Sequence, residues 1–178
     1  MVLHTPPTTL RWRVSAALVL TLVASMTALT TGQTPSASRW VTAWGSAHRA
    51  LGSDMVTNAT VRMIARVTVP GDAVRIRLSN VYGTEPMTIG GASVGLRARG
   101  AALVAGSARP ITFSGSPQVM IPPGGTVTSD PTPLRVLAQQ DVAVSLYVPE
   151  TNVQPSQHTG ALVTSYRTPD EAGDTTLA

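Results

Sequence analysis

The sequence predicts an all-β sandwich or barrel, and three observations lead to that expectation. Beyond residue 38, short runs alternate apolar and polar residues with a period of two, the period of a half-buried strand. Gly, Pro, Asp and Asn interrupt these runs at the intervals expected between the strands of a sandwich. No segment beyond residue 38 shows the spacing of an amphipathic helix.

The N-terminal residues 1–38 are predicted to be a signal peptide followed by a short linker. Arg11 and Arg13 precede an uncharged apolar run from Val14 to Leu29, and small and polar residues follow it. The run is short for a membrane span, although an uncleaved N-terminal anchor remains an alternative. We therefore expect a secreted protein with no stable membrane span after cleavage. The 13 basic residues are all Arg, which indicates a GC-rich genome and a bacterial source.

The β-sandwich domain is expected to occupy residues 39–168. Its predicted strands are Trp40–Trp44, Ala59–Val69, Ala73–Asn80, Met87–Ala98, Ile111–Phe113, Gln118–Ile121, Thr126–Thr128, Leu134–Val136, Asp141–Val148 and Gly160–Tyr166. Within residues 73–80, Val74, Ile76 and Leu78 share one face and Arg77 lies on the other. The turn at residues 122–125 is expected to join two strands as a hairpin, with glycines free to adopt positive φ.

Composition excludes several classes of function. The formal net charge is +4, but the Arg residues are scattered and no basic run is interleaved with aromatics, so a nucleic-acid partner is not expected. There is no Cys, which rules out disulfides and thiolate ligands. Two scattered histidines beyond residue 38, His48 and His158, make a poor metal site. We expect no cofactor and no metal.

One short pattern resembles a catalytic motif. Residues 91–95 read Gly-Ala-Ser-Val-Gly and match the Gly-x-Ser-x-Gly nucleophile elbow, with Ser93 in the nucleophile position. That motif requires a sharp turn and then a helix, whereas the alternation here continues as a strand. We therefore expect Ser93 to be an ordinary strand residue, and we assign no catalytic residue in this chain.

Four residues are candidates for a ligand or interdomain surface: Trp40, Trp44, Asn80 and Tyr82. The two tryptophans either stack on a sugar ring or pack in a core or between domains. Asn80 is expected to have a left-handed backbone, and Tyr82 to cover the corner that follows it. Gly83 is expected to supply a second unusual dihedral angle.

The stretch from Arg75 to Gly90, RIRLSNVYGTEPMTIG, resembles a signature in the front domain of secreted SGNH/GDSL ester hydrolases. Further segments resemble that family in the same order. They are WVTAW at 40–44, TVRMIARV at 60–67, IPPG at 121–124, VTSDP at 127–131, LYVP at 146–149 and TSY at 164–166. The resemblance implies a jelly-roll-like antiparallel β-sandwich followed by an α/β catalytic domain.

That resemblance also implies a function for the parent protein. A Ser nucleophile with a His base would hydrolyse acyl esters of carbohydrates or lipids in the catalytic domain. The Gly-Asp-Ser and Asp-x-x-His blocks of that domain do not occur in this chain. Residues 169–178, with the acidic stretch from Asp170 to Asp174, are expected to be a solvated linker toward the missing domain. The chain would then be an inactive fragment; the alternative is a stand-alone secreted carbohydrate-binding module.

Overall fold

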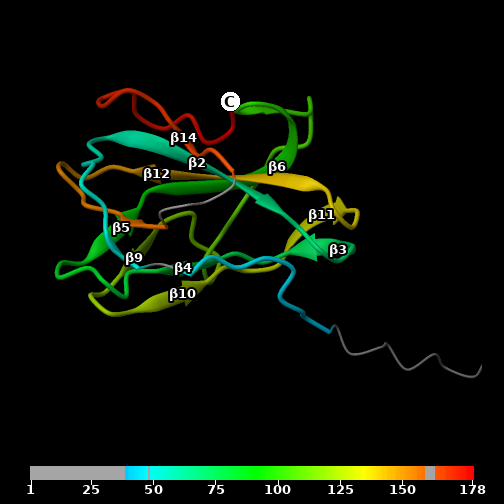
Figure 1. Ribbon diagram of the computed structural model, residues 1–178, viewed down its shortest axis with the longest axis horizontal. Helices are drawn as coiled ribbons and strands as arrows, with labels where there is room; N and C mark the ends of the chain where they lie inside the picture. The colour runs from blue at the N-terminus through cyan, green and yellow to red at the C-terminus, as the bar shows by residue number, and fades with distance from the viewer. Residues whose placement is uncertain (1–38, 48, 159–162) are drawn as a thin grey trace, which may run out of the picture. The chain divides into compact units, whose positions relative to one another are not determined.

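The regular elements that the structure describes are all β-strands, and they pair antiparallel throughout (Figure 1). This computed structural model describes residues 39–47, 49–158 and 163–178, so the predicted signal segment and His48 lie outside the described residues. Residues 42–178 form one compact unit. Among the described residues, no helix has the length and apolar character that crossing a bilayer requires.

The larger layer is a six-stranded sheet. Its order is β14 (Tyr166–Arg167), β2 (Ala59–Arg66), β12 (Asp141–Val148), β6 (Gly91–Arg99) and β7 (Ala102–Leu103), with β8 (Arg109–Pro110) also paired to β6. In Figure 1 this layer occupies the upper half of the domain.

Three two-stranded ladders form the facing layer. They pair β3 (Gly71–Val74) with β11 (Thr132–Val136), β4 (Arg77–Ser79) with β10 (Thr126–Thr128), and β5 (Met87–Ile89) with β9 (Val119–Ile121). A further short ladder pairs β1 (Ala50–Leu51) with β13 (Ser156–Gln157).

The pairing has a simple rule. Counting inward from β1 and from β13, each strand pairs with its counterpart: β1 with β13, β2 with β12, β3 with β11, β4 with β10, β5 with β9 and β6 with β8. The chain is therefore one long hairpin whose centre lies at β7, and the hairpin is rolled so that β6 also pairs with β12. Rolling a long hairpin in this way is the topology of a jelly roll. The predicted all-β antiparallel sandwich is confirmed.

The core lies between the two layers and is built by the period-two alternation. In β12, Val142 and Leu146 face the core, whereas Ser145 between them faces the opposite side of the sheet. Leu78 of the facing layer is also in the core, as predicted. The core cluster of buried residues comprises Val56, Ala59, Ala65, Val67, Ile76, Leu78, Ile89, Ala92, Val94, Ile111, Phe113, Ile121, Leu134, Val136, Val142, Leu146 and Val148.

Two predicted strands are each divided by a change of layer or ladder. The strand expected at residues 73–80 is split into β3 and β4, which pair with different partners. The strand expected at 87–98 is split into β5 and β6 at Gly90. A Cβ at Gly90 would lie 2.8 Å from the ring of Tyr147, so only glycine lets the chain pass this ring.

Other differences concern short or irregular segments. Residues 40–44 form no strand, and Phe113 makes only an isolated bridge to Ser116. Of the strand predicted at 160–166, residues 160–162 lie outside the described residues, and Tyr166 begins β14. The strands β1, β7, β8 and β13 are two residues long and were not predicted.

Candidate functional site

The corner after β4 is held by the side chain of Asn80. This side chain is buried, and its Nδ2 donates hydrogen bonds to the carbonyl oxygens of Glu85 (2.9 Å) and Ile121 (3.1 Å). A longer contact of 3.4 Å reaches the carbonyl oxygen of Pro122. Glu85 belongs to the turn between β4 and β5, and the other two acceptors lie where β9 turns toward β10. Asn80 therefore joins two corners that are distant in sequence.

The backbone of Asn80 strengthens the same junction. Its N–H donates to the carbonyl oxygen of Gly125 (2.8 Å), and its carbonyl oxygen accepts from the N–H groups of Gly124 (2.9 Å) and Gly83 (3.1 Å). The turn at 122–125 is thus not a hairpin, because β9 and β10 pair with β5 and β4 and not with each other. Gly124 does adopt a positive φ of 71°.

The prediction for the dihedral angles at this corner was wrong. Neither Asn80 nor Gly83 has a positive φ. Glycine is required at position 83 for space, since a Cβ there would lie 1.9 Å from Oδ1 of Asn80 and 2.6 Å from its Cγ. The Asn80 side chain occupies the volume that any other residue at position 83 would need.

The remaining surface candidates lie in different surroundings. Tyr82 follows Asn80 in the corner and is 41% exposed. Trp44 is 47% exposed and lies beside Ala43, whose carbonyl oxygen accepts bonds from the N–H and hydroxyl of Thr68. Trp40 is 42% exposed and belongs to the separate unit that ends at Val41. Among the four surface candidates, Asn80 is therefore buried and joins two corners, whereas the three aromatic residues are exposed.

Ser93 is a buried strand residue and not a nucleophile at the tip of a turn. It lies in the middle of β6, is fully buried, and donates its hydroxyl proton to the carbonyl oxygen of Thr176. The two glycines of the pattern leave room for covering segments. A Cβ at Gly91 would lie 2.8 Å from Oδ2 of Asp174, and Gly95 is covered by the segment between β7 and β8. The Gly-x-Ser-x-Gly pattern here reflects close packing against the outer face of the sheet.

Ser93 belongs to a polar row that crosses this outer face. The register aligns Tyr166 of β14, Arg62 of β2, Ser145 of β12 and Ser93 of β6. The Arg62 Nε donates to Oγ of Ser145 at 2.7 Å. The surroundings lower the pKa of the Arg62 guanidinium, because burial disfavours its charged form. Sequence analysis placed Arg62 within a family-like segment but gave no signal for its role.

The other two nitrogens of Arg62 extend the row to distant parts of the chain. Nη1 donates to the carbonyl oxygen of Ala101 (2.7 Å) in the turn before β7, and Nη2 donates to that of Ala178 (2.6 Å). Arg62 therefore fastens the C-terminal segment and the β6–β7 turn to the middle of the sheet.

Residues 169–178, expected to be a solvated linker, pack on the sheet (Figure 1, red). The hydroxyl of Thr60 donates to the carbonyl oxygen of Gly173 (3.0 Å) and accepts from the N–H of Thr175 (2.9 Å). Thr176 is only 5% exposed. Two backbone bonds join Glu171 N–H to Thr57 and Gly173 N–H to Asn58. These hydrogen bonds join the segment to the outer face of the sheet.

A hollow of about 340 Å³ lies where this segment reaches the β7 hairpin. Its lining consists of residues 102–106 together with Arg62, Ala108, Leu177 and Ala178. Val104 and Leu177 are apolar yet 44% and 59% exposed. Arg62 supplies the one charged side chain of this lining.

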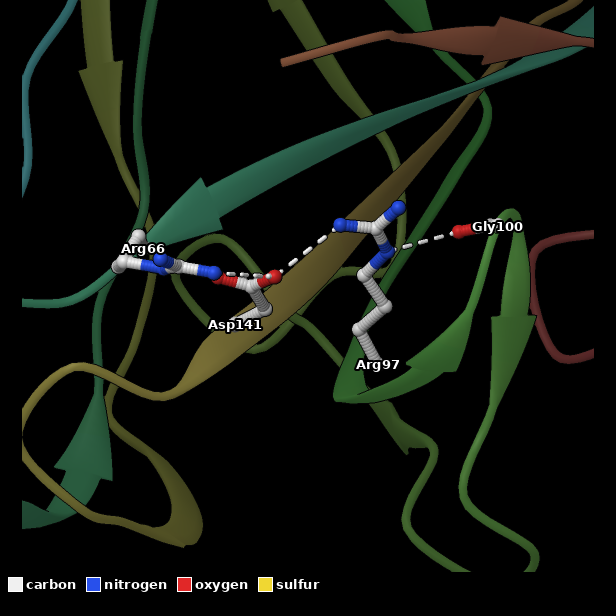
Figure 2. Close-up of polar contacts among 4 residues, drawn as sticks. All are labelled: Arg66, Arg97, Gly100 and Asp141. Atoms are coloured by element: carbon white, nitrogen blue, oxygen red, sulfur yellow. Dashed lines mark hydrogen bonds and ion pairs between the residues drawn. The ribbon is translucent and has the colours of Figure 1, made fainter. Parts of the chain in front are cut away.

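A second charged cluster lies at the start of β12 (Figure 2). Asp141 Oδ1 accepts from Arg66 Nε at 2.7 Å, and Oδ2 accepts from Arg97 Nη1 at 3.0 Å. Arg97 also donates from Nε to the carbonyl oxygen of Gly100. The hydrogen bond from Arg66 lowers the pKa of Asp141, and Arg97 reinforces this effect. A carboxylate kept ionised by two guanidinium groups is suited to joining β2, β12 and β6 and is a poor proton donor.

His158 is the one histidine in the described part of the chain. His158 is exposed, and its Nδ1 bonds the carbonyl oxygen of Ala47. No three His, Cys, Asp or Glu side chains in that part lie close enough together to hold a metal ion.

Comparison with known proteins adds no assignment. No protein-family model matches the chain, and no curated protein matches it significantly.

Proposed function

We propose that this chain is the non-catalytic N-terminal β-sandwich of a secreted SGNH/GDSL-type ester hydrolase. A catalytic domain encoded after it would hydrolyse acyl esters of carbohydrates or lipids with a Ser nucleophile and a His base. In this proposal the sandwich is a rigid partner of that domain and carries none of the chemistry.

The observation that carries the proposal is the corner from Leu78 to Gly90. Its sequence resembles the signature of the family's front domain. Two residues of this corner have a structural role: Asn80 joins both corners, and Gly83 gives it room. The residues of this signature are explained by contacts that hold the sandwich together, which supports a structural role for the domain.

The polar groups that resemble catalytic ones support the same proposal. The hydroxyl of Ser93 is buried beneath the C-terminal segment, with Thr176 as its acceptor. Asp141 is engaged by two arginines, and the ring of His158 bonds a backbone carbonyl. Each of these groups makes a structural contact within the sandwich.

A carbohydrate-binding module is the second candidate, and the exposed tryptophans favour it. Trp44 presents about half of its surface to solvent, and aromatic faces suit pyranose rings. Retardation of the chain on polysaccharide gels would support this function if Trp44→Ala abolished the retardation and Tyr82→Ala, a change at a similarly exposed aromatic residue, did not.

The test of the main proposal is the reading frame beyond codon 178. A Gly-Asp-Ser block followed by Asp-x-x-His, in a product that hydrolyses aryl acetates until that Ser is replaced by Ala, is the expected result. A frame that contains neither block would contradict the proposal.

A further inference from the structure

Two corners of the chain form a small apolar surface at one end of the domain (Figure 1, left). One is the turn between β4 and β5, where Val81 and Tyr82 are 51% and 41% exposed. The other lies at β9, where Met120 is 64% exposed, the highest value among the large apolar side chains that the structure describes. Exposed apolar residues that gather in one patch are typical of an interaction surface.

The buried side chain of Asn80 brings the two corners together and holds them in place. Its Nδ2 bonds the carbonyl oxygens of Glu85 and Ile121, so these two residues lie close to each other. Met120 precedes Ile121, and it faces outward because the side chain of Ile121 is fully buried on the other face of β9. A surface fixed by a buried junction is preorganised, and binding through it costs little conformational entropy.

The charges of this surface are few and balanced. Glu85 is the single charged residue in segments 79–88 and 118–126, which make the two corners. Arg77 on β4 lies three residues before Asn80, and its side chain is exposed like that of Glu85. Within the described part of the chain, neither residue forms an ion pair. A patch with one anion and one cation beside an apolar centre is complementary in charge to a second copy of itself.

We propose that Val81, Tyr82, Glu85 and Met120 form the interface through which two copies of this chain associate as a symmetric dimer. In a two-fold interface the same surface meets itself, so Arg77 of each copy would face Glu85 of the other. Two charge pairs would then flank a centre of Tyr and Met, the residue types enriched where interfaces are most buried. The proposal goes beyond the function proposed above and does not depend on it.

The charges favour a second copy over a lipid surface as the occupant. Glu85 belongs to the same turn as Val81 and Tyr82, which would have to enter the bilayer. Burying a carboxylate without a partner is costly, and anionic headgroups would repel it. A second copy supplies the guanidinium of Arg77 as the partner.

Sedimentation velocity of the purified chain over about a hundredfold range of concentration tests the dimer, which should form by mass action. Val81→Asp should raise the dissociation constant at least about tenfold, because it places two carboxylates in the apolar centre. Val104→Asp is the matched control, since Val104 is 44% exposed but lies between β7 and β8, outside the corner surface. A chain that is monomeric throughout, or a dimer indifferent to Val81→Asp, would overturn the proposal.

Charge reversal tests the two-fold arrangement. Arg77→Glu and Glu85→Arg each place like charges opposite one another and should raise the dissociation constant about tenfold. The double variant restores opposite charges and should return to within about threefold of the wild-type value. Arg135→Glu, at an exposed position on β11, controls for the change in net charge. A double variant as weak as the single variants would overturn the two-fold pairing.

Vesicle flotation separates the dimer from the alternative occupant. We expect no binding of the chain to phosphatidylcholine vesicles. A chain that stays monomeric in solution and floats with these vesicles, unless it carries Val81→Asp, would assign the surface to a lipid and overturn the dimer.

Discussion

The junction made by Asn80 predicts a large and specific loss of stability in Asn80→Ala. The side chain is 8% exposed and makes two hydrogen bonds, of 2.9 and 3.1 Å, to Glu85 and Ile121. Losing two such bonds costs about 2 kcal/mol, and leaving the carbonyl of the fully buried Ile121 without this donor adds about 1 kcal/mol or more. We expect the free energy of unfolding to fall by about 3 kcal/mol, which lowers Tm by about 10 °C.

Gly83 makes the prediction sharper, because its neighbour is Asn80 itself. The three atoms nearest to a Cβ at position 83 are Oδ1, Cγ and Nδ2 of Asn80, at 1.9, 2.6 and 2.9 Å. Gly83→Ala must therefore displace the Asn80 side chain and should cost about as much as Asn80→Ala. In the Asn80→Ala background those three atoms are gone, and Gly83→Ala should then change stability by less than about 0.5 kcal/mol.

Urea denaturation of the four proteins in this double-mutant cycle measures the coupling directly. We expect the double variant to be about as stable as Asn80→Ala, which gives a coupling energy of about 2 to 3 kcal/mol. Gly45→Ala is the control, since nothing lies within 4 Å of a Cβ there and its backbone needs no glycine. Additive effects of the two substitutions would refute the packing argument for the corner.

Three further predictions concern the strands and their outer face. Leu78→Asp should unfold the domain, at a cost of more than about 4 kcal/mol, whereas Arg77→Ser on the exposed face should not; equal thermal midpoints would show an incorrect register. The pKa of Asp141 is lower in the folded chain than in the unfolded chain. Its contribution to the free energy of unfolding is therefore present above about pH 4 and is lost as the pH falls through the pKa of the folded chain. In Asp141→Asn, the free energy of unfolding should thus fall less steeply as the pH is lowered below about 4. An unchanged dependence on pH would count against the ion pairs. Gly91→Ala should push Asp174 aside, lower stability by about 1 kcal/mol and accelerate amide exchange in residues 174–178; unchanged exchange would show that the segment does not need this space.

The parts of the fold that the sequence predicted are those with one apolar and one polar face. The bounds of β12 and of β10 agree with prediction because alternation and turn residues mark both ends. Strands of two residues, such as β7 and β13, contain no period to detect. The division of residues 73–80 was missed because the same face of the chain stays buried while it passes from one ladder to the next.

The candidate site was predicted only in part. Sequence analysis selected Asn80 and assigned glycine a conformational need at position 83, but the actual cause is a close contact between the two residues. The C-terminal segment was expected in solvent because it is acidic. Its anchors are the hydroxyl groups of Thr60 and Ser93 and the guanidinium of Arg62, and such polar contacts leave no hydrophobic pattern in a sequence.

The central claim is that this chain carries no esterase chemistry of its own, and hydrolysis of an aryl acetate by the purified chain tests it most directly. With Ser93 buried beneath the C-terminal segment, we expect the rate to equal the buffer background in both the wild-type chain and Ser93→Ala. Turnover well above background in the wild-type chain that is abolished by Ser93→Ala, with no loss of folded protein by circular dichroism, would contradict the account.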